Sequence, residues 1–143
     1  MGKINNIVIK KLWEDNELFE FSITCSSSII SATTHIYVSK QKVRHLCDQL
    51  EQFCANKLES FEWASGMFGD DTTACVSFSF SRVDVLGHIV IEVAMELDDG
   101  APFSTHNCCF YIQTELGLIY SFFTRLPILF EKDSDNTTVS LNA

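Results

Sequence analysis

Basic residues are scarce in this sequence. Ten lysines and arginines stand against nineteen aspartates and glutamates, which gives a formal net charge of −9. A nucleic-acid binder needs an excess of Lys and Arg to displace counterions from phosphates, so this balance argues against DNA or RNA as a partner. The same acidity is compatible with a basic protein partner, because opposite charges steer encounter, and also with a role in solubility alone.

Long apolar segments are lacking as well. The first eleven residues contain neither the apolar stretch nor the small-residue cleavage site of a signal peptide. The most apolar segment, Leu116 to Phe130, is interrupted by Arg125 and Pro127 and is too short to cross a bilayer. We therefore expect a cytoplasmic protein of bacterial type that does not bind membranes.

Motifs for catalysis, metal binding and cofactor binding are absent. The chain has six cysteines and four histidines, but no C-x-x-C, H-x-x-x-H or H-E-x-x-H spacing. His106 and Cys108 are the one local pair suited to a metal or to a cysteine nucleophile, because side chains two apart on a strand share a face. We expect no metal, no cofactor and no enzymatic activity, with six reduced cysteines acting as small apolar residues.

The sequence does contain a regular succession of short amphipathic segments. A hydrophobic fraction of 46% and twelve phenylalanines predict a globular domain with an aromatic core. Period-two alternation predicts strands at 7–12, 18–25, 29–38, 60–65, 74–80, 88–98 and 105–113. Apolar residues three and four apart predict helices from Lys40 to Ala55, capped by Ser39, and from Glu115 to Leu126, capped by Thr114. No internal repeat is visible.

The order of these segments predicts the fold class. Groups of strands are each followed by a helix, without strand–helix alternation, which excludes a doubly wound parallel sheet. We expect an α+β fold: a curved antiparallel β-sheet meander with two amphipathic helices packed on one face. Residues 1–130 should form a single domain. The polar segment 131–143 should be a flexible C-terminal tail.

The outward face of segment 88–98 is the candidate site for partner binding. Its members are His88, Glu92, Glu96 and Asp98, beside small residues of the preceding strand at Cys75, Ser77, Ser79 and Ser81. Glu92 and Glu96 should lie about 13–14 Å apart along a strand. Paired glycosidase carboxylates are about 5–9.5 Å apart, so this chemistry is not indicated. We interpret the stripe either as the solvated side of a sheet or as a surface that binds a protein.

Several segments resemble the small immunity proteins of the WapI type, which accompany polymorphic toxins in bacteria. The similar segments are Leu50-Glu51-Gln52-Phe53, Phe61-Glu62-Trp63, Val76-Ser77-Phe78-Ser79-Phe80, Gly87-His88-Ile89-Val90-Ile91-Glu92-Val93, Thr114-Glu115-Leu116 and Phe122-Phe123-Thr124-Arg125-Leu126. The resemblance implies a non-catalytic protein that neutralises a toxin, often a nuclease, by direct binding. A basic toxin domain would then be the partner.

Two other functions stay open. A small-ligand-binding or enzymatic domain would have a pocket between the sheet and the C-terminal helix, lined by His106, Cys108 or Tyr111. A structural protein would act as a dimer through an exposed strand. The sequence does not distinguish a monomer from a homodimer.

Overall fold

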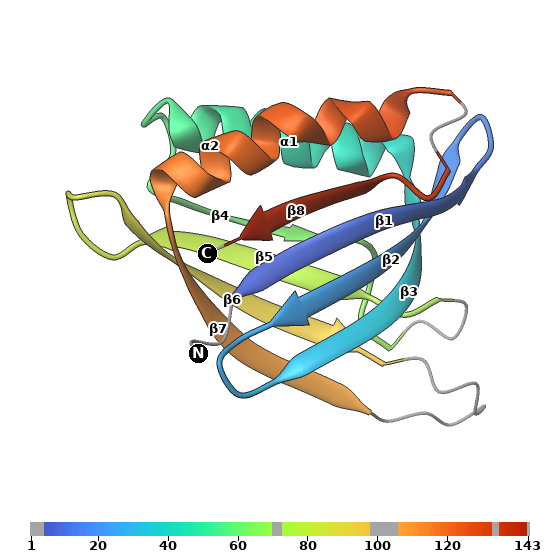
Figure 1. Cartoon of the computed structure of the whole chain (residues 1–143), viewed down its shortest axis with the longest axis horizontal. Helices are drawn as coiled ribbons and strands as arrows, with labels where there is room; N and C mark the ends of the chain where they lie inside the picture. The colour runs from blue at the N-terminus through green and yellow to red at the C-terminus, as the bar shows by residue number, and fades with distance from the viewer. Residues whose placement is uncertain (1–4, 70–72, 98–105, 133–134, 143) are drawn as a thin grey trace.

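The computed structural model describes residues 5–69, 73–97, 106–132 and 135–142. Within these ranges the chain forms two four-stranded antiparallel sheets, two α-helices and a 3₁₀ helix (Figure 1). Sheet A has the order β3 (Ser31–Ser39), β2 (Leu18–Ser26), β1 (Asn6–Glu14), β8 (Thr138–Asn142). Sheet B has the order β4 (Ser60–Ala64), β5 (Val76–Arg82), β6 (His88–Glu96), β7 (Asn107–Glu115).

The helices connect the two sheets. Helix α1 (Lys40–Cys54) leads from β3 to β4, and α2 (Leu116–Arg125) with η1 (Leu126–Phe130) leads from β7 to β8. Both helices lie side by side across one end of the two facing sheets (Figure 1). The predicted α+β class, with antiparallel strands and two helices, is confirmed. The strands form two sheets rather than one because α1 carries the chain across from the first to the second.

The core fills the space between the sheets and beneath the helices. Alternate residues of each strand are buried there, as the period-two pattern predicted. Aromatic rings meet where α1 covers sheet B: Phe61 stacks on Phe80 with ring centroids 4.7 Å apart, and Phe53 packs edge-on against Phe61 at 5.5 Å. The predicted aromatic core is therefore confirmed.

The two helices begin differently. Ser39 Oγ accepts a hydrogen bond from the Lys42 N–H at 3.1 Å, so the predicted cap of the first helix is confirmed. The predicted cap of the second helix is wrong. Thr114 is a buried residue of β7 that pairs with Ile89, and Glu115 takes the N-cap position without a side-chain hydrogen bond. The strand extends further than expected because Thr114 lies on the face that the core covers.

A bulge in β1 turns a partly buried glutamate to the core-facing side of the strand. Ile7, Ile9 and Lys11 point inward, and strict alternation would place Trp13 next on that face. The register with β2 instead shifts between Lys11 and Trp13, so that Glu14 pairs with the buried Phe19. Trp13 is left on the outer face, half exposed, and the Glu14 carboxylate lies beside the Lys11 ammonium.

Lys11 is completely buried, with 0% exposure, and its ammonium is fully hydrogen-bonded. Its three donors are used by Glu14 Oε1 at 2.6 Å, the Leu129 carbonyl at 3.0 Å and the Glu131 carbonyl at 3.0 Å. Lys40 pairs with the other oxygen of Glu14 at 2.6 Å. Together the two cations lower the pKa of Glu14. The stabilising effect of this carboxylate is therefore present above its ordinary pKa and is lost as the pH falls through the lowered value.

The segment expected to be a tail is in part a strand of the sheet. Residues 138–142 form β8, which pairs with β1 from Asn6–Asn142 to Lys10–Thr138. Val139 and Leu141 are buried, and the Arg125 guanidinium of α2 donates to the Ser140 carbonyl at 2.6 Å. For these residues the expectation of a tail outside the domain is wrong. Two apolar side chains in a polar segment are a weak signal, and the partner strand lies at the other end of the sequence.

The two halves of the molecule repeat one another, although no repeat is visible in the sequence. In each half, three consecutive antiparallel strands run directly into a helix, and a short strand completes the sheet beside the first of the three. Strands β2 and β6 bury the same alternate positions, and β3 and β7 do so as well apart from their last residue. The short strand of the second unit, β4, precedes its three strands in the chain, whereas the short strand of the first unit, β8, is at the C-terminal end. The order of elements is therefore a circular permutation of two consecutive units.

The same contact joins hairpin and helix in both units. The N–H of Lys40, the first residue of α1, donates to the Glu17 carbonyl at 2.8 Å. The N–H of Leu116, the first residue of α2, donates to the Gly87 carbonyl, also at 2.8 Å. In each hairpin an aspartate, Asp15 or Asp84, accepts hydrogen bonds from backbone N–H groups of the turn. Matching contacts at matching places indicate a true structural repeat.

Removal of the buried ammonium should destabilise the domain. Lys11→Met leaves the buried Leu129 carbonyl, the partly buried Glu131 carbonyl and the Glu14 carboxylate without their shared partner, so we expect the free energy of unfolding to fall by about 3–5 kcal/mol. Urea denaturation of the variant measures this loss. Lys10→Met, on the outer face of the same strand, is the matched control and should change stability by less than about 0.5 kcal/mol. A Lys11→Met protein as stable as the control would contradict the assignment.

The repeat predicts that the chain tolerates permutation. Asn6 pairs with Asn142, so the ends of β1 and β8 adjoin. We expect a permutant that joins Ala143 to Met1 and opens between Lys57 and Leu58, in the α1–β4 connection, to fold with an unchanged circular dichroism spectrum. Opening between Glu92 and Val93, within a central strand of sheet B, is the control and should abolish folding. Failure of both permutants alike would argue against the two-unit description.

Candidate functional site

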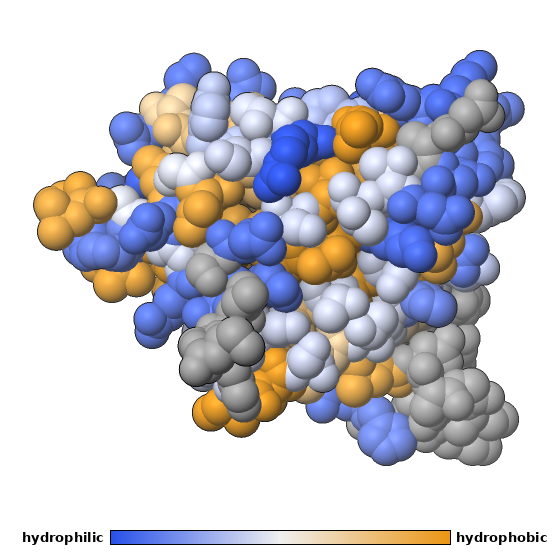
Figure 2. Space-filling model, in the orientation of Figure 1, coloured by the Kyte–Doolittle hydropathy of each residue, from blue (hydrophilic) through white to orange (hydrophobic). Residues whose placement is uncertain are grey.

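The outer face of sheet B differs sharply in charge from that of sheet A. In the strands of sheet A, the outward positions carry one cation, Lys10, and one anion, Glu20, which cancel. The outward positions of β4 to β7 carry Glu62, Glu92, Glu96 and Glu115 and no lysine or arginine, because Arg82 at the end of β5 is on the inward face. We call this surface the acidic face. Figure 2 views the opposite side, where the outer face of sheet A has mostly pale, weakly polar colours.

The register of sheet B places the carboxylates on a surface of small side chains. One row across the sheet runs from Glu62 through Ser79 and Glu92 to Tyr111. With adjacent strands about 4.8 Å apart, Glu62 and Glu92 are separated by about 10 Å. Serines and alanines occupy the neighbouring rows at Ser77, Ser81 and Ala94. The predicted outward orientation of His88, Glu92 and Glu96 is thereby confirmed.

Glu92 interacts with a tyrosine that the sequence analysis assigned elsewhere. The Tyr111 hydroxyl donates to Glu92 Oε2 at 2.8 Å, and this hydrogen bond raises the pKa of Tyr111. Tyr111 was expected to line a pocket beneath the C-terminal helix. It lies instead on the outer face, more than half exposed. An exposed tyrosine next to a carboxylate offers apolar area and a hydrogen bond to a docking protein at low entropic cost.

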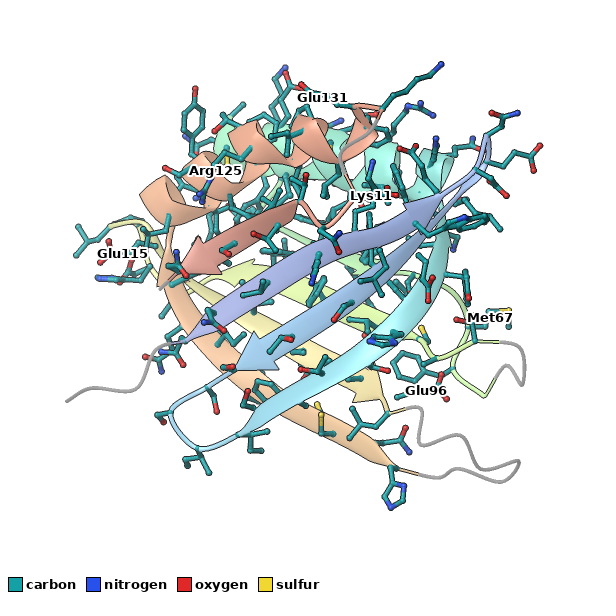
Figure 3. The ribbon with its side chains drawn as sticks, turned by 45° about the vertical axis from the view of Figure 1, so that its right-hand side comes forward. Lys11, Met67, Glu96, Glu115, Arg125 and Glu131 are labelled. Atoms are coloured by element: carbon teal, nitrogen blue, oxygen red, sulfur yellow. The ribbon has the colours of Figure 1, made fainter. Side chains whose placement is uncertain are left out.

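Glu96 holds the loop between β4 and β5. Its Oε2 accepts the Gly69 N–H and its Oε1 accepts the Cys75 N–H, both at 3.0 Å. Figure 3 shows Glu96 beside Met67 at one end of sheet B, with Glu115 at the other end. Because both oxygens of Glu96 accept hydrogen bonds from backbone donors, this residue has a structural role in addition to its place on the acidic face.

His88 lies at the end of β6 next to the β5–β6 turn. Its Nδ1 is 2.6 Å from Asp84 Oδ2, and Asp84 Oδ1 accepts the Leu86 N–H at 2.8 Å. The Asp84 carboxylate, and more weakly Glu115, raise the pKa of the His88 imidazole. The histidine therefore braces the turn most strongly when it is protonated.

Other residues of the predicted site lie elsewhere. Asp98 is outside the residues that the structure describes. Cys75 is buried and precedes the first residue of β5, so it does not contribute to the outer face. Glu62 and Glu115 belong to the acidic face but were not predicted. Their alternation with buried neighbours was visible in the sequence, whereas the strand order that brings them beside Glu92 was not.

A shallow hollow of about 450 Å³ lies between the β5–β6 turn and the start of α2. Its lining includes Arg82, Leu86, His88, Glu115 and Gly117. The Arg82 guanidinium is 4.6 Å from the Phe53 ring and donates to the Phe53 carbonyl, so it is directed towards the core. The hollow lies beside α2, as the ligand-binding alternative required, but His106, Cys108 and Tyr111 do not line it.

The cysteines differ in burial: Cys25 and Cys75 are buried in the core, whereas Cys109 is exposed on the outer face of β7. All six thiols are free, and burial raises the pKa of Cys25, of Cys47 to about 11, and of Cys54 and Cys108. A raised pKa lowers the fraction of reactive thiolate at neutral pH. Among the described residues, no three His, Cys, Asp or Glu side chains are grouped to hold a metal ion. None of the described helices has the length and apolar character needed to cross a membrane.

The His88–Asp84 pair predicts a shifted titration. We expect the His88 resonances in an NMR titration to have a midpoint above 6.5, and the pair's contribution to be lost as the pH rises through that midpoint. Asp84→Asn keeps the turn acceptor but removes the charge, so the midpoint should return towards 6.5. Asp15→Asn, at the corresponding turn of sheet A, is the control and should leave His88 unchanged. A midpoint that Asp84→Asn does not lower would refute the pairing.

Comparison of the chain with protein-family models, with curated proteins and with solved structures gives no match. The resemblance to immunity proteins of the WapI type therefore stays a prediction from the sequence.

Proposed function

We propose that this chain is a non-catalytic protein-binding domain that docks a basic protein on the acidic face of sheet B. The observation that carries the proposal is the contrast between the two sheets. The same strand arrangement supports an outer face of balanced charge in sheet A, and an outer face with four glutamates and no outward lysine or arginine in the strands of sheet B. The fold therefore does not require this charge, and a partner of opposite charge would explain it.

The shape of the acidic face supports the same conclusion. Serine and alanine side chains leave the sheet surface approachable, and Glu62, Glu92 and Tyr111 stand above it in one row. Like charges on two copies would repel each other, so the acidic face is unsuited to a symmetric homodimer. A monomer that binds a different, basic protein fits the charge better.

An immunity protein is the specific form of this proposal. Such a protein binds a toxin directly, and many nuclease domains are basic because they bind phosphates. The resemblance to the WapI type and the acidic face support this role independently of each other. The expected setting is the bacterial cytoplasm, with the toxin domain encoded beside this chain.

Charge reversal on the acidic face tests the proposal. With the toxin domain from the neighbouring gene, or the protein that co-purifies from the native host, Glu62→Lys and Glu92→Lys should each weaken binding about tenfold or more at low salt. The effect should appear mainly in the association rate and shrink as ionic strength rises. Surface plasmon resonance at several salt concentrations measures both.

Glu20→Lys makes the same change on the outer face of sheet A and is the matched control. We expect it to alter affinity less than twofold. Equal losses from Glu20→Lys and Glu92→Lys would mean that net charge, and not the acidic face, determines binding. No loss from either reversal on sheet B would reject the proposal.

A further inference from the structure

The turn between β5 and β6 exposes three aliphatic side chains that the fold does not use. Val85 is 100% exposed, Leu86 79% and Val83 62%. The turn itself depends on the Asp84 carboxylate and on Gly87, whose φ of 93° suits glycine. We call Val83, Val85 and Leu86 the apolar tip. In Figure 2 it protrudes at the left and has the colour of hydrophobic residues.

The structural repeat provides an internal comparison for this tip. The corresponding turn of sheet A, between β1 and β2, contains Asp15, Asn16 and Glu17, all polar and exposed. In both turns an aspartate side chain accepts hydrogen bonds from backbone N–H groups. In both, one carbonyl of the turn accepts a hydrogen bond from the N–H of the first residue of a helix. An apolar sequence is therefore not needed to build this hairpin, and exposing it to water is unfavourable unless another molecule covers it.

The surroundings of the tip indicate what covers it. The tip projects from the end of the acidic face that contains Glu115, and the hollow of about 450 Å³ lies at its base. Asp84 and Glu115 flank the apolar side chains, while Arg82 is directed towards the core by Phe53. Acidic neighbours disfavour an anionic lipid surface and a second copy of this chain, and favour a protein with lysines or arginines around an apolar pocket.

We infer that the apolar tip is the anchor by which this domain engages its basic protein partner, inserting Val85 and Leu86 into an apolar pocket rimmed by cations. The inference rests on the proposed function and assigns different steps of binding to the two surfaces. The acidic face accelerates encounter, and the apolar tip, once desolvated, slows dissociation. Central apolar anchors surrounded by polar contacts are the usual source of binding energy in protein interfaces.

Site-specific photo-crosslinking in the native host tests which molecule meets the tip. A photoreactive amino acid replaces Val85, and in the matched variant it replaces Ile29, which is 85% exposed at the β2–β3 turn of sheet A. We expect one basic protein to be linked at position 85 and not at position 29. Linkage at position 85 to lipid, to this chain itself or to an acidic protein, or no linkage there, would overturn the inference.

Affinity measurements with the purified linked protein complete the test. Leu86→Asp should weaken binding at least 30-fold through a faster dissociation rate, at 0.5 M NaCl as well as at low salt, while Ile29→Asp should change it less than twofold. Circular dichroism confirms that both variants fold. If Glu92→Lys weakens binding and Leu86→Asp does not, the proposed binding at the acidic face is supported and the proposed anchoring role of the apolar tip is rejected. If Glu62→Lys and Glu92→Lys have no effect, the proposed function itself fails.

Discussion

The ammonium group of Lys11 joins two segments of the chain that are distant in sequence, β1 and residues 129–131. It is bound by Glu14 from its own strand and by the carbonyls of Leu129 and Glu131, which follow α2. A buried charge is tolerated only when each of its donors is satisfied, so the positions of the β1 bulge, η1 and the start of β8 all depend on one another. This contact ties β1 to the segment that connects α2 with β8.

The repeat separates what the fold requires from what is free to vary. Both units need alternating buried residues, an aspartate in the hairpin and a carbonyl for the first N–H of the helix. Neither needs glutamates on its outer face or valine and leucine in its turn. Sheet B has an excess of outward glutamates and an apolar β5–β6 turn, whereas the single outward Glu20 of sheet A is balanced by Lys10 and the β1–β2 turn is polar. Sheet B is therefore where the sequence departs from structural necessity. This difference is the basis on which we propose a common role in binding for the acidic face and the apolar tip.

Local pattern was enough to predict most elements of this fold. The first helix with its Ser39 cap, the inward stripe of β6 and the outward orientation of Glu92 all follow from periodicity, which depends only on neighbouring residues. The pairing of β8 with β1, the inward turn of Glu14 and the hydrogen bonds of Glu96 to Gly69 and Cys75 do not. Each depends on a contact between residues far apart in the chain or on a bulge that shifts the alternation. Strand order could not be predicted from the sequence either. For that reason Glu62 and Glu115 could not be assigned to the site.

The pairing of β1 with β8 has a consequence for synthesis on the ribosome. Sheet B and α1 are complete once residues 40–115 have emerged, because all their strand partners lie within that range. Sheet A is different. Its strand β1 lacks a partner on one edge until residues 138–142 are synthesised, and the Lys11 ammonium lacks two of its acceptors until Leu129 and Glu131 are synthesised. Until then one edge of β1 is unpaired and a cation faces the forming core. Sheet B therefore has all of its strands before sheet A does, and the domain closes on its N-terminal strand last.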